Sequence, residues 1–226
     1  MRENISVIDL FAGPGGLNEG FNRFRNLGGT SPIFKNRLSV EMDSRAHMTL
    51  QLRAMYREML ATGMDTGPYW AYVNAANEDA RGRKRTQSDK TIGFKEDLKA
   101  TLAEAAQEAP KPLKLGEDNS EINELLSDRL VKGEPWVLLG GPPCQAYSRM
   151  GASRMKNANP EKFALDHRHK LYQEYLRIVA RWRPSVFVME NVKGILSSEH
   201  GKDTGVEGAI VHQIIADLEH PAKAVA

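Results

Sequence analysis

The feature of this sequence that most constrains its fold is the alternation of short apolar runs with segments of helical period. Four runs have the length and residue types of buried strands, and they span residues 5–10, 38–42, 136–139 and 186–189. Such alternation is typical of a parallel sheet that carries helices on its faces. The sequence therefore predicts an α/β fold with a doubly wound, mostly parallel sheet.

Apolar residues at helical spacing predict four helices packed on this sheet. These sets are Leu17, Phe21 and Phe24; Met48, Leu52, Met55 and Met59; Leu171, Tyr175, Ile178 and Trp182; and Ile210, Ile214 and Leu218. The stretch 63–133 breaks the pattern with Gly, Pro and charge clusters, and we interpret it as an insertion packed on the sheet. We interpret its basic run 81–85 as a solvated loop, with contact to phosphate as the alternative.

Composition bounds the class of protein more than the function. The 226 residues, 41% of them hydrophobic, suffice for one globular domain over 1–226, and a net charge of +2 does not by itself indicate a nucleic-acid binder. No apolar run approaches the roughly 18 residues of a membrane span, and residues 1–7 lack a signal-peptide pattern, so we expect a cytoplasmic protein. The single cysteine excludes an internal disulfide and a multi-thiolate zinc site, and we predict no metal site.

A glycine-rich turn follows the first apolar run in Asp9-Leu10-Phe11-Ala12-Gly13-Pro14-Gly15-Gly16-Leu17. Glycines let backbone N–H groups approach a ligand closely, and the start of a helix favours negative charge. Glu41 lies 28 positions after Gly13, at the end of the second apolar run, where a carboxylate can accept hydrogen bonds from ribose hydroxyls. The pair indicates a cofactor that contains adenosine, and leaves NAD and S-adenosylmethionine both open.

The only cysteine, Cys144, lies directly after the third run, in Gly140-Gly141-Pro142-Pro143-Cys144-Gln145-Ala146-Tyr147-Ser148. Two prolines restrict this loop, so the thiol is presented rigidly at a carboxyl strand end, where open α/β sheets bind their ligands. A buried structural cysteine would more often lie within an apolar run. The position favours a chemical role for the thiol.

Glu190 and Asn191 follow the fourth run, in Val186-Phe187-Val188-Met189-Glu190-Asn191-Val192. An acid at the mouth of an apolar strand can be partly withdrawn from water, which favours its protonated form and lets it share a proton near neutral pH. Taken alone, Glu190 is equally a helix cap or a member of an ion pair.

Together these residues resemble the DNA (cytosine-5) methyltransferases. DLFAGPGGL is similar to the first motif of that family, GGPPCQAYS to its nucleophile motif and FVMENVKG to its Glu-Asn-Val motif, in the family's order. The segment from Asp166 to Tyr172 is similar to the family's D-x-R-x-x-L segment. The resemblance implies a Rossmann-like fold of the S-adenosylmethionine-dependent methyltransferases and transfer of a methyl group to C5 of cytosine in double-stranded DNA.

The implied chemistry is consistent with the residues present. Cytosine C5 is a poor nucleophile, and addition of the Cys144 thiolate to C6 would make C5 reactive. Glu190 would bind the N3 edge of the base, which must be flipped out of the duplex. The resemblance also assigns cofactor-binding and substrate-binding residues. The cofactor set is Phe11, Ala12, Gly13, Gly15, Gly16, Leu17, Glu41, Met42 and Leu171, and the substrate set is Pro143, Gln145, Ser148 and Asn191.

The sequence departs from the family pattern in two places. The family has an acid after a third strand that reads the adenine amino group; Asp65, Asp79 and Asp97 are candidates, and none follows a convincing strand. Only 36 residues (226 − 190) follow Glu190, without a visible catalytic Arg motif, target-recognition domain or final cofactor motif. We therefore expect a C-terminally incomplete catalytic region that is weak or inactive alone and needs a second segment or chain.

Two other classes of function compete with this interpretation. One is a non-catalytic remnant that binds S-adenosylmethionine or a protein partner, although Cys144 and Glu190 are both retained. The other is an NAD enzyme with Cys144 as acyl nucleophile, which leaves the Pro-Pro-Cys-Gln and Glu-Asn-Val segments unexplained. The DNA target and the biological role, such as restriction-modification, are not encoded in the residues that carry the resemblance.

Overall fold

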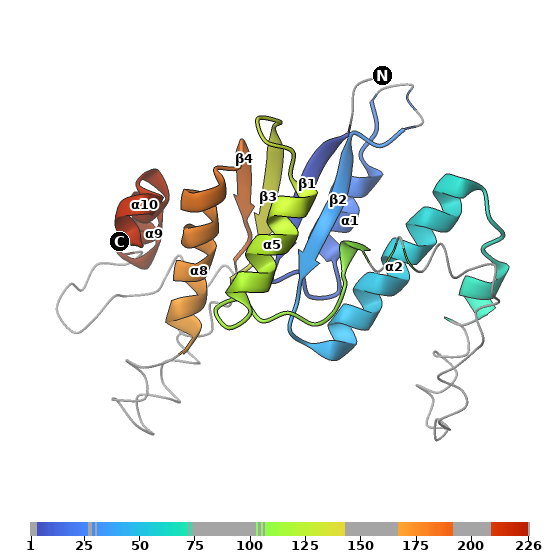
Figure 1. The fold of residues 1–226 in the computed structure, drawn as a ribbon, viewed down its shortest axis with the longest axis horizontal. Coiled ribbons are helices and arrows are strands. Elements are labelled where there is room, and N and C mark those ends of the chain that lie inside the picture. The colour runs from blue at the N-terminus through green and yellow to red at the C-terminus, as the bar shows by residue number, and fades with distance from the viewer. Residues whose placement is uncertain are drawn as a thin grey trace.

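The fold is that of a parallel sheet between helices, as a computed structural model shows (Figure 1). The structure describes residues 4–26, 29, 31–71, 73, 103, 105, 107–142, 167–191 and 209–225. The sheet has the order β2-β1-β3-β4, and every pairing is parallel. The strands are β1 (Ile5–Leu10), β2 (Phe34–Val40), β3 (Trp136–Gly140) and β4 (Val186–Met189). The predicted α/β class and parallel sheet are confirmed.

Helices cover both faces of this sheet. The main helices are α1 (Gly16–Arg23), α2 (Ser44–Thr62), α5 (Asn119–Arg129), α8 (His167–Trp182), α9 (Ala209–Glu219) and α10 (Pro221–Ala224). In Figure 1, α5 and α8 lie in front of the strands and α1 lies behind them. The chain is therefore wound on both sides of the sheet, as the alternation of elements requires.

Two apolar clusters hold the layers together, one on each face. On the α5 and α8 face, Ile8, Leu38 and Leu138 of the strands pack with Ile122 and Tyr175 of the helices. On the α1 face, a smaller cluster of strand residues packs against the helix; its members include Val7, Val137, Leu139, Leu17 and Phe21. Alternate residues of each strand thus serve opposite faces, which explains why β3 (WVLLG) and β4 (VFVM) are apolar at nearly every position.

The second half of the stretch 63–133 belongs to the main core. Leu113, Leu115, Ile122 and Leu126 are each at most 3% exposed and pack in the same cluster as the strands. Within this stretch, Asn119–Arg129 forms α5, whereas the basic run 81–85 lies outside the described residues. That residues 63–133 form an insertion stays a prediction.

The sequence placed two elements imperfectly. The second strand begins at Phe34 and ends at Val40, not at 38–42, because polar Asn36 in its first half is buried and hydrogen-bonded to the Asn22 side chain. In α2 the buried face includes His47, Leu50, Ala54, Met55 and Met59, whereas Met48 is 51% exposed. Met48 was therefore wrongly predicted to belong to the buried stripe of its helix.

Local signals explain where α2 begins and ends. The Asp43 carboxylate accepts hydrogen bonds from the N–H groups of Arg45 and Ala46, which caps the first turn. Gly63 ends the helix with φ 71°, a left-handed conformation that costs glycine little. Among the described residues, the helices are too short or too polar to cross a membrane.

Candidate functional site

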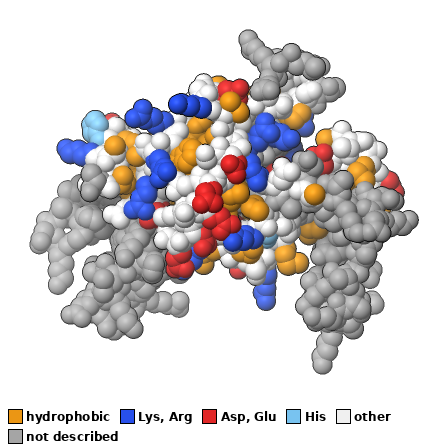
Figure 2. All heavy atoms as spheres, in the orientation of Figure 1, with side chains coloured by type: hydrophobic (Ala, Val, Ile, Leu, Met, Phe, Trp, Pro, Cys, Tyr) orange, Lys and Arg blue, Asp and Glu red, His pale blue; other side chains and the backbone are white. Residues whose placement is uncertain are grey.

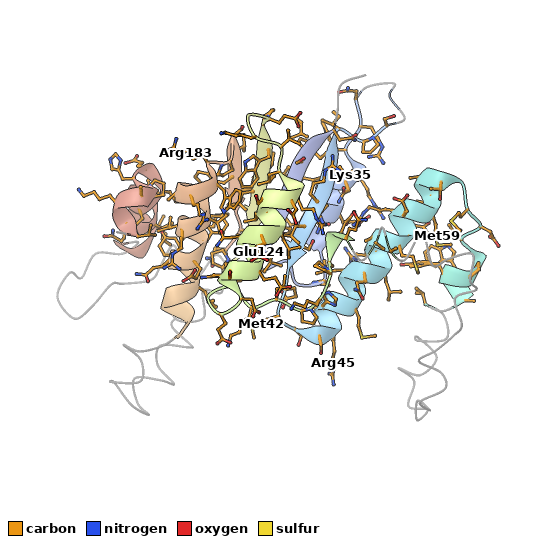
Figure 3. The ribbon with its side chains drawn as sticks, viewed as in Figure 1. Lys35, Met42, Arg45, Met59, Glu124 and Arg183 are labelled. Atoms are coloured by element: carbon orange, nitrogen blue, oxygen red, sulfur yellow. The ribbon has the colours of Figure 1, made fainter. Side chains whose placement is uncertain are left out.

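The expected ligand-binding residues gather along the carboxyl edge of the sheet. The glycine turn follows β1, Glu41 follows β2, Gly141 follows β3 and Glu190 follows β4. Figure 3 labels Met42 and Arg45 at this lower edge, and Lys35 and Arg183 at the opposite edge. Parallel strands bring their carboxyl ends to one side, so four segments distant in the sequence share one edge.

The turn after β1 has the backbone of a ligand-binding loop. Phe11, Gly13 and Gly15 all have positive φ, at 55°, 53° and 81°. A positive φ is unusual for phenylalanine and marks a strained position of the kind that clusters at functional sites. Among the described residues, a side chain added at Gly13 or Gly16 would meet no atom within 4 Å, so open space lies there beside the loop and the first residue of α1.

Glu41 is tied to this loop. The Gly13 N–H donates to Glu41 Oε2 at 2.8 Å, and the Asp43 N–H donates to Glu41 Oε1 at 2.7 Å. Two N–H groups therefore orient the carboxylate between the ends of β1 and β2. The two residues that the sequence singled out as a pair are thus in direct contact, whereas their role in binding a cofactor stays a prediction.

The other predicted cofactor residues occupy different environments. Phe11 and Ala12 are half-buried in the loop, and Met42 is 60% exposed beside Glu41. Leu17 packs against the apolar cluster on the α1 face, and Leu171 is half-buried near the start of α8. Their assignment to the cofactor stays a prediction.

The ends of β3 and β4 bring Glu190 to the loop that leads to the cysteine. The Glu190 N–H donates to the Gly140 carbonyl at 2.8 Å, and the Asn191 side chain donates to the Pro142 carbonyl at 3.4 Å. A methyl group at Gly141 would stand 2.8 Å from Glu190 Oε2, so the carboxylate lies directly over this glycine. Glu190 is exposed, so the expected partial withdrawal from water is not seen.

Four predicted site residues lie outside the described residues: Pro143, Cys144, Gln145 and Ser148. The described chain stops at Pro142, which is buried, two residues before Cys144. The structure thus places Glu190 and Asn191 against the start of the cysteine loop. The meeting of the thiol and the carboxyl group stays a prediction.

The position of Asp9 beneath the glycine loop was not predicted from sequence. This carboxyl group is 1% exposed, and the Asn18 amide donates to it at 3.0 Å. Burial raises the pKa of Asp9 to about 7 and the Glu41 charge adds to the rise, while the hydrogen bond from Asn18 opposes it. A charged residue type inside an apolar strand was the available signal.

A second unpredicted feature is the segment beside the end of β2. The Leu113 N–H donates to the Glu41 carbonyl at 2.8 Å, so the chain at Leu113 lies at this edge. Asp118 Oδ2 accepts a hydrogen bond from the Lys114 N–H at 2.7 Å. Asp65 instead follows the far end of α2, and Asp79 and Asp97 lie outside the described residues.

A groove in another part of the molecule does not belong to the carboxyl edge of the sheet. A groove of about 530 Å³ lies between α8 and α10, lined by residues that include Val179, Arg183, His220 and Lys223. Arg183 precedes β4, so this groove lies toward the amino ends of the strands. On the face shown in Figure 2, acidic and basic side chains are interspersed with hydrophobic ones, in keeping with the small net charge.

Comparison with known proteins finds similar sequences with a named function. The family described as C-5 cytosine-specific DNA methylase matches residues 116–219. The type II methyltransferase M.Bpa9945I of Bacillus paralicheniformis is 31% identical over 202 residues, which cover 87% of this chain and 42% of that protein. These matches support membership of the chain in the C-5 cytosine-specific DNA methylase family.

Two further similar proteins also carry the name of a methyltransferase. The putative type II methyltransferase M.MjaORF1200P of Methanocaldococcus jannaschii is 27% identical over 221 residues, which cover 92% of this chain and 52% of that protein. A DNA-cytosine methyltransferase of Escherichia coli is 40% identical over 67 residues, or 29% of this chain and 14% of that protein. The chain therefore spans about half the length of the curated relatives that it matches over most of its own length.

Proposed function

We propose that this chain is the catalytic, cofactor-binding part of an enzyme that methylates C5 of cytosine in double-stranded DNA. The observation that carries the proposal is the contact between the Glu190 segment and the start of the cysteine loop, beside the glycine loop and Glu41. Because the chain spans about half of its relatives, recognition of the DNA target is assigned to a further segment or a partner chain.

The glycine loop and Glu41 fit S-adenosylmethionine. Open space lies beside Gly13 and Gly16, and the oriented Glu41 carboxylate can accept hydrogen bonds from the two ribose hydroxyls. Glu117 and Asp118, which follow Leu113 in the chain, are the candidates for reading the adenine amino group, in place of Asp65. When bound, this cofactor supplies an electrophilic methyl group on a sulfonium centre.

The protein's own residues then act on the base. Cys144 would add through its sulfur to cytosine C6 and move electron density to C5, which could then take the methyl group that the cofactor supplies, with S-adenosylhomocysteine as the group released. Loss of the C5 proton to a base and cleavage of the sulfur–C6 bond restore the aromatic ring and free the thiolate. The target base must leave the duplex to reach this edge, at a cost of a few kcal/mol.

Glu190 and Asn191 would hold the flipped base. A protonated Glu190 can donate to N3 of cytosine and so stabilise the charge that builds on the ring as sulfur adds. The Asn191 amide, which already donates to the Pro142 carbonyl, would fix the loop that presents Cys144. These roles require the carboxylate to keep its position over Gly141.

The product of the reaction tests this function. The chain is incubated with S-adenosylmethionine and DNA, alone and with the C-terminal half of the Bacillus paralicheniformis relative, and the nucleosides are separated by mass spectrometry. We expect 5-methyl-2′-deoxycytidine, with little or none from the chain alone. Methyl groups on an exocyclic amine, or none under either condition, would contradict the proposal.

Replacing Gly141 by alanine should impair the reaction more than the fold. The added methyl group meets Oε2 of Glu190 at 2.8 Å, and the end of a flexible, exposed side chain can move away. We expect the free energy of unfolding to change by less than about 1 kcal/mol and methylation to fall by about tenfold to a hundredfold. Denaturant unfolding and initial methylation rates measure the two effects.

A matched control separates the cause. Gly133, at φ 88° in the turn before β3, has no atom within 4 Å of the position that an added methyl group would take, and it is distant from the site. Gly133→Ala should therefore affect stability alone. Equal losses of methylation in Gly141→Ala and Gly133→Ala, at equal folded fractions, would count against the role of the Glu190 position.

A further inference from the structure

The buried carboxyl group of Asp9 lies directly beneath the glycine loop. Asp9 is the last residue but one of β1, where it pairs with Ser39 of β2 and Leu139 of β3. It is 1% exposed, and the five residues of the loop, 11–15, follow it after Leu10. Asp9 therefore lies next to the backbone that would hold the cofactor.

Asn18 connects Asp9 to the far end of the same loop. Asn18 is the third residue of α1 and is itself 1% exposed. Its Nδ2 donates to Asp9 Oδ2 at 3.0 Å and to Ser39 Oγ at 3.1 Å. Hydrogen bonds between side chains thus connect β1, α1 and β2 next to the loop.

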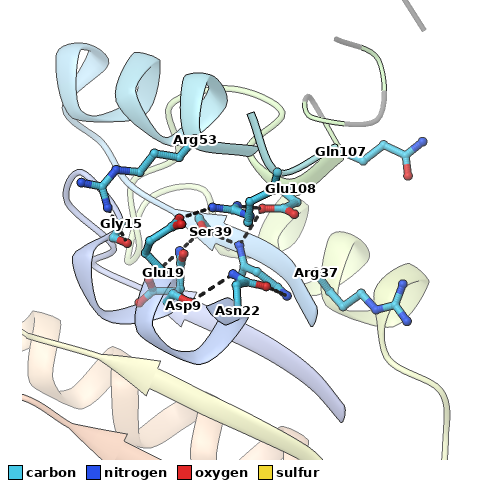
Figure 4. Close-up of polar contacts among 12 residues, drawn as sticks. Asp9, Gly15, Glu19, Asn22, Arg37, Ser39, Arg53, Gln107 and Glu108 are labelled. Atoms are coloured by element: carbon cyan, nitrogen blue, oxygen red, sulfur yellow. Dashed lines mark hydrogen bonds and ion pairs between the residues drawn. The ribbon is translucent and has the colours of Figure 1, made fainter. Parts of the chain in front are cut away.

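A polar network anchors this tie to α2 (Figure 4). The Asn36 amide donates to Ser39 Oγ at 2.9 Å and to Glu108 at 3.2 Å, and Arg57 pairs with both Glu108 and Glu19. From the same helix, the Arg53 guanidinium donates to the Gly15 carbonyl at 3.2 Å. The loop and the polar group around Asp9 are therefore both connected to α2.

The surroundings of Asp9 disfavour the ionised form of its carboxyl group. Burial is the main cause of its raised pKa, and Glu41 contributes a like charge from the end of β2. On α8, the buried Tyr175 hydroxyl has its pKa raised by burial and then by the Asp9 charge, so it is a further titratable group near Asp9. On α1, Glu19 is already paired with Arg23 and Arg57.

We propose that Asp9 is a positioning residue for the cofactor loop, and that binding of a sulfonium cofactor is coupled to loss of a proton from its carboxyl group. This rests on the proposed function. The ionised carboxylate accepts the Asn18 hydrogen bond, and the positive sulfonium above the loop compensates its buried charge. The protonated form instead has a hydroxyl to donate, and Asn18 Oδ1, buried without a hydrogen-bond partner among the described residues, is an acceptor when the amide turns.

The sign of the pH effect follows from linkage. A bound cation favours the ionised carboxylate, so binding lowers the pKa of Asp9 from its value of about 7 in the free protein and releases a proton near that pH. Affinity for S-adenosylmethionine should therefore rise between pH 6 and pH 8, by about three- to tenfold. S-adenosylhomocysteine, whose sulfur is neutral, should show little of this rise.

The first test uses calorimetry with both ligands at pH 6, 7 and 8, in buffers of different ionisation enthalpy. Asp9→Asn keeps the shape and removes the ionisable group, and Asp128→Asn makes the same change on the exposed surface of α5. We expect proton release with S-adenosylmethionine in the wild type and in Asp128→Asn, and a flat profile in Asp9→Asn. An unchanged pH profile in Asp9→Asn, or equal release with S-adenosylhomocysteine, would overturn the inference.

A second test uses the wild-type protein alone, and its result is compared with the binding data of the first test. In the unliganded wild-type protein, the NMR signals of the Gly13 and Gly15 amides and of the Asn18 side chain should titrate together with a midpoint near pH 7. Absence of that titration overturns the role of Asp9 and leaves the proposed function standing. Titration without any binding of S-adenosylmethionine, at any pH, instead overturns the cofactor assignment and with it the proton coupling.

Discussion

Cys144→Ala should lower the rate of cytosine methylation by about 10³-fold or more, the scale of loss when a covalent nucleophile is removed. The physical reason is that C5 of cytosine cannot attack a methyl donor efficiently until a nucleophile has added at C6. Initial rates of 5-methylcytosine formation, measured at saturating DNA and S-adenosylmethionine, give the effect on the chemical step.

Binding of the cofactor supplies the control for this loss. The glycine loop and Glu41 come from other strands, so Cys144→Ala should bind S-adenosylmethionine within about twofold of the wild type. A variant that retains a tenth or more of the wild-type rate would show that Cys144 is not the nucleophile. Loss of cofactor binding together with the rate would indicate a disturbed fold instead.

Gly140→Ala should destabilise the protein by about 2–3 kcal/mol, near the upper end for overpacking in a core. The added methyl group would stand 2.6 Å from Cε2 of Tyr175 and 3.1 Å from the Leu10 carbonyl oxygen. The Tyr175 ring is fully buried in the main core, and the Leu10 oxygen belongs to the backbone of the sheet. Moving either of them away would therefore cost free energy. Denaturant unfolding at fixed pH measures the change in free energy.

A double-mutant cycle identifies the clash. Tyr175→Leu alone should also destabilise, because it leaves a cavity, but Gly140→Ala should then cost at least about 1 kcal/mol less in the Tyr175→Leu background. Strictly additive effects would show that the ring does not press on Gly140. Since Gly140 immediately precedes the cysteine loop, a shift of β3 should also reduce methylation in the part of the sample that stays folded.

The sequence predicted the architecture well because buried parallel strands leave a strong local signal. The strands at 5–10 and 186–189 have the predicted bounds, since each is a short run of mainly apolar residues that ends at a turn or at polar residues. The second strand was placed too late, because Asn36 is polar and its burial depends on a hydrogen bond with Asn22, fourteen positions earlier. Such a bond has no signature in a window of residues.

The candidate site, like the fold, has features with a signal in the sequence and features without one. The sequence singled out Gly13 and Glu41 because both lie just after apolar runs, and the ends of neighbouring parallel strands bring them into contact. The buried tie from Asp9 to Asn18 could not be predicted, because a carboxylate inside an apolar run gives no indication of its partner. In α1, likewise, the buried positions include Asn18 and Asn22, whereas Phe24, expected to pack, is 57% exposed.

The most direct measurement of the central claim is covalent trapping by DNA that contains 5-fluorocytosine. Fluorine at C5 cannot be lost as a proton, so the adduct formed after methyl transfer persists, and peptide mapping by mass spectrometry locates the attached residue. With the C-terminal half of the relative supplied, we expect one adduct, on Cys144, absent from Cys144→Ser. An adduct on another residue, or one that forms in Cys144→Ser, would contradict the assignment of Cys144 as the nucleophile.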